Sequence, residues 1–354
     1  MSFLRFFLYL LLNIAVPLTA TTAEASFGSQ KILKSCWKDV ELAGTAGDRY
    51  IRRSYRGNTI SPPPEVVQQA ASMLPKLSKS RQGSIRYVQV EGNKKLVALT
   101  FDLCESGGEI AGYERDIVNY LRKHNIKSTF YAGGKWMRSH EQKTMQLMAD
   151  PLFEIGNHAW THGNLRKLKG QPMQNQILWT QAQYKILRDK LSQQACYKKA
   201  VSTESARIPK LSTTFRFPYG VCSNESLSAL SDHGLAAVQW NIVSGDPWRG
   251  QSAKNIAATI LKNIKPGSII VAHANGRGFN TAKSLRLFIP KLLSLGYQFV
   301  TVSELLDSGK AYSASSCYEW TPGDNLRYDR PGGSRWKFRS SQPPGHTSSP
   351  FLDL

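Results

Sequence analysis

The sequence has few acidic residues and few long apolar runs. Its 354 residues include 25 Asp and Glu against 46 Lys and Arg, which gives a formal net charge of +21. A protein with this balance is suited to anionic polymers, and an anionic envelope surface is therefore the expected partner. No nucleic-acid-binding motif accompanies the charge, so nucleic acid is not a predicted partner. We see no internal repeat, so a repeat architecture is not predicted either.

One apolar run stands out, at residues 6–20, and it is shorter than the ~20 residues that a membrane span requires. It contains Asn13 and Pro17, and a small-x-small motif follows at 23–25. These features predict a signal peptide at 1–25 that is cleaved, and hence a protein exported to the periplasm or secreted. The alternative is an uncleaved N-terminal anchor. No other segment is long enough to span a membrane, so no stable span is expected.

Cysteine is scarce but its placement is informative. Cys36 and Cys317 lie near the two ends of the mature chain, while Cys196 and Cys222 bracket a basic stretch rich in Ser and Thr. A disulfide within each of these two sets would join the termini and connect the two ends of the basic stretch. Such disulfides form in an oxidising compartment. The sequence does not choose among the three connectivities of four cysteines, and reduced thiols are the alternative. Cys104 is left over.

Polar residues stand at the ends of several predicted strands. A carboxylate at the C-terminal end of a parallel strand is where α/β barrels place reacting groups. The strand at 95–101 runs into Asp102, the strand at 214–217 carries Arg216 before Pro218 and Tyr219, the strand at 238–242 leads to Asp246, and the strand at 267–272 ends on His273.

Two histidines, His158 and His162, follow the apolar run at 152–156. A spacing of four places both imidazoles on one face of a helical turn, where two neutral nitrogens reach one divalent cation. The alternative is a pair of histidines that only form hydrogen bonds.

The order of these motifs resembles the polysaccharide deacetylase family, also called NodB-homology or carbohydrate esterase family 4-like. The motifs are Thr-Phe-Asp, His-x-x-x-His, Arg-x-Pro-Tyr, an Asp near Trp and a strand-terminal His, and they cover about 96–306. The resemblance implies an α/β fold, a distorted (β/α) barrel. It also implies a divalent metal and the hydrolysis of N-acetyl groups from amino sugars in a polymer.

Helical patterns alternate with the strands, as a barrel requires. We expect helices at 65–74, 112–125, 139–149, 173–192, 252–264 and 281–294. The predicted division is a signal peptide at 1–25, an irregular N-terminal extension at 26–85, a NodB-homology domain at 86–308 and a basic, largely disordered tail at 309–354.

One departure from the family pattern affects the metal site. The family has a second Asp after Thr-Phe-Asp as a metal ligand, and this sequence has Leu103 there. Three substitutes are open: Glu105 as an oxygen ligand, Cys104 as a thiolate in a Cys-His-His site, or water. Glu105 is the predicted ligand beside His158 and His162, with the capping of the following helix as its alternative role. Zn²⁺ is the expected metal, and Co²⁺ or another transition metal is the alternative.

The resemblance and the residue types together suggest roles in amide hydrolysis. Asp102 would accept the proton of the attacking water, and Arg216 would pair with Asp102 and keep it ionised. His273 would act as general acid, with Asp246 at its other nitrogen raising its pKa. The backbone N–H of Tyr219 resembles the family's oxyanion donor.

The predicted function is therefore metal-dependent removal of N-acetyl groups from an envelope or exported polysaccharide of the chitooligosaccharide or peptidoglycan type. A variant of this function removes a formyl group from a lipid-linked amino sugar. A second hypothesis is a catalytically impaired carbohydrate-binding protein on the same fold, since fold alone does not determine function. A third makes Cys104 the nucleophile of a Cys-His hydrolase.

Overall fold

The computed structural model describes residues 30–53, 61–63, 74–201 and 208–330. The predicted signal peptide, residues 65–73 of the helix expected at 65–74 and the tail beyond 330 lie outside these residues. Among the described helices, none combines the length and the apolar character needed to cross a membrane.

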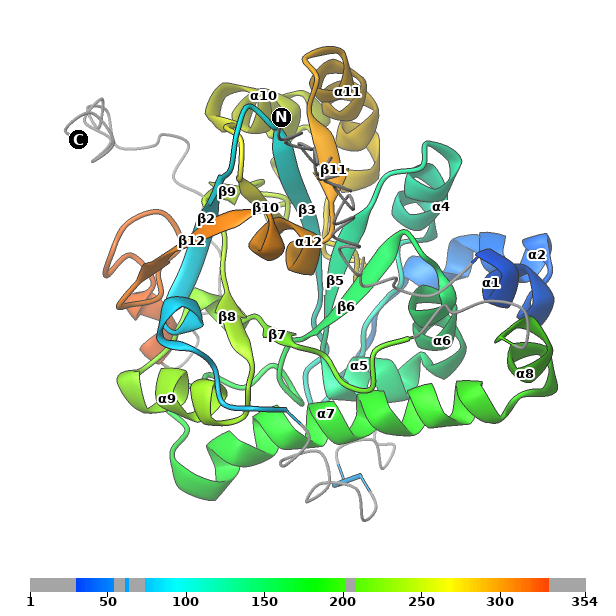
Figure 1. The fold of residues 1–354 in the computed structure, drawn as a ribbon, viewed down its shortest axis with the longest axis horizontal. Coiled ribbons are helices and arrows are strands. Elements are labelled where there is room, and N and C mark those ends of the chain that lie inside the picture. The colour runs from blue at the N-terminus through cyan, green and yellow to red at the C-terminus, as the bar shows by residue number, and fades with distance from the viewer. Residues whose placement is uncertain (1–29, 54–60, 64–73, 202–207, 331–354) are drawn as a thin grey trace, which may run out of the picture.

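The central feature is a ten-stranded sheet with the order β12-β2-β8-β7-β6-β5-β3-β10-β9, and β11 pairs with β3 off this path. Figure 1 shows the sheet curling, with helices packed around it. The strands are β2 Ser84–Val90, β3 Leu96–Leu103, β5 Ser128–Ala132, β6 Phe153–Asn157, β7 Thr214–Phe215, β8 Ala236–Val238, β9 Ile242–Val243, β10 Ile269–His273, β11 Gln298–Val300 and β12 Gly309–Ala314. A separate two-stranded sheet joins β1 Arg52–Arg53 to β4 Glu109–Ile110.

Helices alternate with these strands. They are α1 Gln30–Cys36, α2 Asp39–Ala43, α4 Arg115–Lys123, α5 Gly134–Ser139, α6 Glu141–Ala149, α7 Gly170–Gln193, α8 Ala195–Val201, α9 Asn224–Asp232, α10 Ala253–Asn263, α11 Thr281–Ser294 and α12 Val302–Asp307. The five predicted helices that fall within described residues correspond to α4, α6, α7, α10 and α11, which confirms the strand and helix alternation.

The sheet closes on itself incompletely. Its ladders are parallel except for β12 on β2, and an isolated antiparallel bridge joins Tyr87 of β2 to Ser268, just before β10. The backbone N–H of Val88 also donates to the carbonyl of Gly267. These contacts bring the two sides of the sheet together, so the fold is the distorted (β/α) barrel that the sequence predicted.

Alternation along β3 separates two buried layers. Leu99, Phe101 and Leu103 point into the apolar core beneath the helices, whereas Ala98 belongs to the core inside the barrel. Because successive side chains of a strand point to opposite faces, Asp102 lies on the interior side. Leu103, fully buried on the helix side, therefore faces away from the strand-end site.

Two of the boundary predictions need correction. β12 extends the main sheet through an antiparallel ladder with β2, so residues 309–330 are not part of a disordered tail. The N-terminal extension is not wholly irregular either, because Ile32 and Leu33 of α1 are buried in the main core.

The disulfides differ from the pairing considered for the sequence. Cys36 of α1 is bonded to Cys196 of α8, and Cys222 is bonded to Cys317. The pairing of Cys36 with Cys317, and of Cys196 with Cys222, is thus wrong. Cys104 is free and buried.

Candidate metal and catalytic site

A cluster of three side chains lies at the C-terminal ends of β3 and β6. Ligand atoms of Cys104, His158 and His162 all lie within 4.8 Å of one another. The Cys104 Sγ is 3.3 Å from the His158 Nε2, and the two imidazole ring centres are 5.0 Å apart. Two tetrahedral zinc ligands, at bond lengths of about 2.3 Å for sulfur and about 2.0 Å for nitrogen, are separated by roughly this S···N distance.

The histidine pair does not lie on a helical turn, contrary to the prediction. β6 ends at Asn157, and the following loop carries both histidines. Ala159 and His162 have positive φ values of 62° and 58°, which turn the chain back so that His162 returns to His158. A non-glycine residue in this region costs about 1–2 kcal/mol, so the surrounding contacts must hold the loop.

The hydrogen bonds of His158 fix which nitrogen faces the cluster. Its Nδ1 donates to the carbonyl oxygen of Arg216 at 2.9 Å, so Nε2 is the nitrogen that faces Cys104. A backbone partner of this kind orients most metal-binding histidines. Burial alone would lower the pKa of His158, but the charge of Asp102 and the contact with Cys104 raise it.

The electrostatics of Cys104 favour a thiolate. Burial alone would raise its pKa, but the charges of His162 and His158, together with hydrogen bonds from both rings, hold the pKa well below its usual value. A thiolate is the form in which cysteine binds metals. The donor set of one thiolate and two imidazoles thus fits a divalent transition metal such as zinc.

Asp102 sits at the edge of this cluster. The Arg216 Nη1 donates to one Asp102 oxygen at 2.9 Å, and the other oxygen is 3.7 Å from the His158 Nε2. Arg216 is fully buried, and it also donates to the hydroxyl of Thr100 and to the carbonyls of Val238 and Gln239. Arg216 therefore fixes Asp102 with one carboxylate oxygen turned toward the histidines.

A second pair consists of His273, the last residue of β10, and Asp246. Because β10 is parallel to β3 with His273 opposite Asp102, the two residues emerge side by side. The His273 Nδ1 donates to Asp246 at 2.9 Å, and Ser244 and Thr281 also donate to that carboxylate. Burial alone would lower the pKa of His273, but Asp246 raises it well above its ordinary value.

The prediction that Glu105 is the third ligand does not fit the structure. Its carboxylate accepts hydrogen bonds from Lys135 Nζ at 2.6 Å, from the Ser139 hydroxyl at 2.5 Å and from the Ala111 backbone at 2.8 Å. Burial raises its pKa, and these three donors oppose the rise. Glu105 is thus occupied by α5 and its surroundings, and the Cys104 alternative fits the described residues instead.

Tyr219 forms the rim of the cluster. It lies in a short 3₁₀ turn, Pro218–Gly220, with a positive φ of 60°. Its ring centre is 4.4 Å from that of His162 and 5.1 Å from that of Tyr328, which comes from the C-terminal part of the chain. Sequence reasoning missed Tyr328, because the segment around it was predicted to be disordered.

Other functional partners were also missed. Lys135 and Thr281, which hold the Glu105 and Asp246 carboxylates, lie in helices far along the chain. Their spacing in the sequence carries no signal, since each contact depends on how a helix packs against a strand end.

Comparison with known proteins identifies a matching family and several relatives. Residues 89–238 match the polysaccharide deacetylase family. A peptidoglycan-N-acetylglucosamine deacetylase of Bacillus cereus is 30% identical over 220 residues, covering 62% of this chain and 70% of that protein. The enzyme PgdA of Listeria monocytogenes, which carries the same description, is 30% identical over 222 residues, and the match covers 62% of this chain but 41% of that protein. This chain thus spans about two fifths of the PgdA length.

Solved structures of deacetylase-family proteins also resemble this chain. A peptidoglycan N-acetylglucosamine deacetylase in complex with a hydroxamate-type benzamide is 26% identical, with a TM-score of 0.52 over 66% of this chain and 96% of that one. A CE4 family pseudoenzyme from Bacillus anthracis shares the fold, at 23% identity and a TM-score of 0.52 over 66% of this chain and 70% of that one. Together with the sequence matches, this shows that the chain belongs to the polysaccharide deacetylase (NodB homology) family.

Proposed function

We propose that this protein is a metal-dependent hydrolase that removes N-acetyl groups from amino sugars of an envelope or exported polysaccharide. The observation that carries the proposal is the convergence of Asp102, His273 and the Cys104, His158 and His162 cluster at adjacent strand ends. The relatives named as peptidoglycan and chitooligosaccharide deacetylases support the substrate class.

Cys104, His158 and His162 would hold the metal. When bound there, a divalent cation would polarise the amide carbonyl and lower the pKa of the attacking water. Zn²⁺ is the metal that this donor set favours, and Co²⁺ is the nearest alternative.

The remaining residues supply proton transfer. Asp102 accepts the proton that water loses as its oxygen bonds to the amide carbon. His273, held by Asp246, then donates a proton to the nitrogen as the carbon–nitrogen bond breaks, which leaves acetate and a free amine. The backbone N–H of Tyr219 would donate to the developing oxyanion.

The disulfides and the charge support the proposed export of the protein. Two disulfides within the described residues are typical of an oxidising compartment, and they support export of the chain through its predicted signal peptide. A net charge of +21 favours an anionic envelope surface as a partner.

The test measures metal content, together with acetate release from N-acetylglucosamine oligomers and from peptidoglycan. We expect about one metal per chain and release of acetate. Cys104→Ala should weaken metal binding by about 100-fold or more, whereas Cys104→Asp, which restores an oxygen ligand, should recover part of the binding. His273→Gln is the matched variant that keeps the metal and loses activity.

Other outcomes distinguish the alternatives. Metal binding without release of acetate from any glycan would favour the carbohydrate-binding protein, and release of formate from a formylated amino sugar would favour the deformylase. Activity that survives a chelator but not Cys104→Ala would identify a thiol nucleophile and would overturn the metal mechanism.

A further inference from the structure

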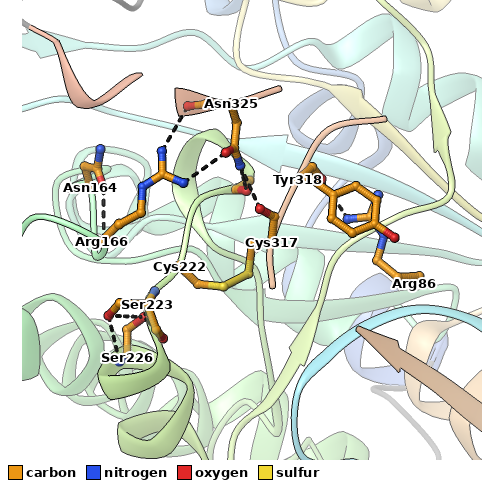
Figure 2. The surroundings of a disulfide bond; sticks show 10 residues. Arg86, Asn164, Arg166, Cys222, Ser223, Ser226, Cys317, Tyr318 and Asn325 are labelled. Atoms are coloured by element: carbon orange, nitrogen blue, oxygen red, sulfur yellow. Dashed lines mark hydrogen bonds between the residues drawn. A yellow bond between two sulfur atoms is a disulfide. The ribbon is translucent and has the colours of Figure 1, made fainter. Parts of the chain in front are cut away.

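A segment at the C-terminal end of the described chain lies against the site. This segment, Cys317–Asp329, is called the clasp below. It follows β12, and the disulfide to Cys222 ties its first residue to the chain just beyond the Tyr219 turn. Figure 2 shows this disulfide together with Asn325 of the clasp, which is joined by hydrogen bonds to Arg166. The family match ends at 238, so the clasp lies outside the matched region.

The clasp is fixed to the barrel at its first residues. Arg86 of β2 donates to the carbonyls of Tyr318 and Glu319 at 2.7 and 3.0 Å, and its guanidinium lies 3.9 Å from the Tyr318 ring centre. The Trp240 indole donates to the same Glu319 carbonyl. Arg86 is buried, so this attachment is not a surface contact.

Asn325 links the clasp to both loops of the site. It is fully buried, and its Nδ2 donates to the carbonyl of Gly220, next to Tyr219, and to the carbonyl of Cys317. Its Oδ1 accepts from the Arg166 Nη1 at 2.9 Å. One side chain thus joins the Tyr219 turn, the disulfide and the loop that carries His162.

The His162 loop makes further contacts with the clasp. The Arg166 Nη2 donates to the backbone of Asn325 at 3.0 Å, and its Nε pairs with Asp329 at 2.9 Å. The Asn164 side chain donates to the carbonyl of Tyr328 at 3.1 Å. These residues lie two and four positions beyond His162, so the clasp bonds directly to the loop that supplies one candidate ligand.

Both loops contain residues in left-handed conformations, namely His162 and Tyr219. Such conformations persist only where surrounding contacts over-determine them. The rings of His162, Tyr219 and Tyr328 form a continuous contact, with centres 4.4 and 5.1 Å apart. The Tyr328 hydroxyl donates to Glu319 at 2.7 Å, which fixes the last ring of this row.

We propose that the clasp is a positioning element of the site: Asn325 and the Cys222–Cys317 disulfide hold the His162 loop against the Tyr219 turn. The candidate ligand His162 and the ring of Tyr219 are thereby held in position before substrate binds. The proposal rests on the function proposed above. Residues that hydrogen-bond to metal ligands and orient them lower metal affinity by about 10- to 100-fold when they are lost, and the proposal assigns this part to a segment outside the matched region.

The second disulfide provides a matched control. Cys36–Cys196 joins α1 to α8, which lie apart from the clasp in Figure 1. The two disulfides join cysteines that are 160 and 95 positions apart in the sequence. Because the entropy of loop closure grows only with the logarithm of loop length, removing either disulfide should cost a similar free energy of unfolding. A difference in metal binding between the two losses therefore reports position and not stability.

The experiment compares Cys222→Ser/Cys317→Ser with Cys36→Ser/Cys196→Ser in the full chain. Asn325→Leu and Arg166→Met, singly and together, serve as variants that keep both disulfides. Affinity for Co²⁺ is measured below the unfolding temperature of each variant, with the visible spectrum, in which the thiolate charge-transfer band reports Cys104. Acetate release gives kcat and KM separately.

We expect the clasp variants to bind Co²⁺ about 10- to 100-fold more weakly, to show altered ligand-field bands and to lose kcat more than KM. The control should stay within about twofold of wild type in affinity. Asn325→Leu and Arg166→Met should be non-additive, since they break one contact from its two sides. Folded clasp variants with wild-type affinity, spectrum and kcat would overturn the proposal.

A failure of the proposed function is distinguishable. If the wild-type protein binds no metal and releases no acetate, the function is wrong, and amide hydrogen exchange of residues 158–167 then tests the clasp. Exchange at least tenfold faster in the clasp variants than in the control would support a positioning role. Equal exchange in the two disulfide variants would overturn it.

Discussion

Asp102 and Glu105 are two buried carboxylates only three residues apart, yet their surroundings differ. Each is paired with a buried cation, Arg216 or Lys135. Both oxygens of Glu105 are taken up by donors of its own neighbourhood, whereas Asp102 turns one oxygen toward His158. Burial and ion pairing therefore do not distinguish a reactive carboxylate from a structural one. The feature that distinguishes the two is a carboxylate oxygen that faces the candidate site, as in Asp102.

The largest expected effect comes from changing each carboxylate to its amide. Asp102→Asn should lower kcat by about 10³- to 10⁴-fold, because general-base catalysis contributes up to that factor. Glu105→Gln should leave kcat within about threefold when measured below its unfolding temperature, since the carboxylate faces α5. The measurement is acetate release from N-acetylglucosamine oligomers.

Stability must be followed in the same pair. Asp102→Asn removes the carboxylate that pairs with the buried Arg216. We expect this loss to lower the free energy of unfolding by about 3 kcal/mol. Near-normal kcat for a folded Asp102→Asn protein would contradict the role of this residue. A loss of kcat in Glu105→Gln as large as in Asp102→Asn would remove the contrast.

The next effect is structural. Lys135→Met should lower the free energy of unfolding by about 4 kcal/mol, because it leaves Glu105 buried without its cation. The control is Lys190→Met, which removes a solvent-exposed pair with Glu141 and should cost less than about 1 kcal/mol. Urea unfolding checks both variants, and equal costs would show that burial does not decide the strength of these pairs.

The smallest effect is a pH dependence beside Glu105. His140 Nδ1 lies 3.9 Å from a Glu105 oxygen, and the imidazole stacks on Trp136. Burial lowers the pKa of His140 to about 4. As the pH falls below about 6.5, the unfolded state takes up a proton that the folded state refuses, so this histidine removes stability progressively until the pH reaches about 4.

Between pH 7 and pH 5 this linkage amounts to about 2 kcal/mol. His140→Gln should therefore lose less stability than the wild-type protein over this interval, by about that amount. Urea unfolding at the two pH values is the measurement. An identical loss in both proteins would show that His140 is protonated in the folded state at pH 5.

Much of the barrel was accessible from the sequence. Helix and strand periodicity predicted the alternating elements, and the polar residues at 102, 216, 246 and 273 were found because a strand that ends on a charged residue must present it at the sheet edge. The pairs of Asp102 with Arg216 and of His273 with Asp246 are formed as expected. Their roles in catalysis stay predictions.

The sequence could not decide what happens one residue past the end of β3. Up to Leu103 the twofold alternation of a strand fixes which side chain faces inward, but the chain beyond it has no period. Cys104 and Glu105 are both plausible ligands by type, and the position of Lys135 on a helix 30 residues later selects between them.

The sequence by itself thus determined the fold class, the order of the motifs and the residue types gathered at the strand ends, because these depend on local periodicity. The tertiary structure alone decided which side chain gathers with His158 and His162, the disulfide pairing and the place of Cys317–Asp329 beside the candidate site. Each of these depends on contacts between segments far apart in the chain, where packing and not spacing brings the atoms together.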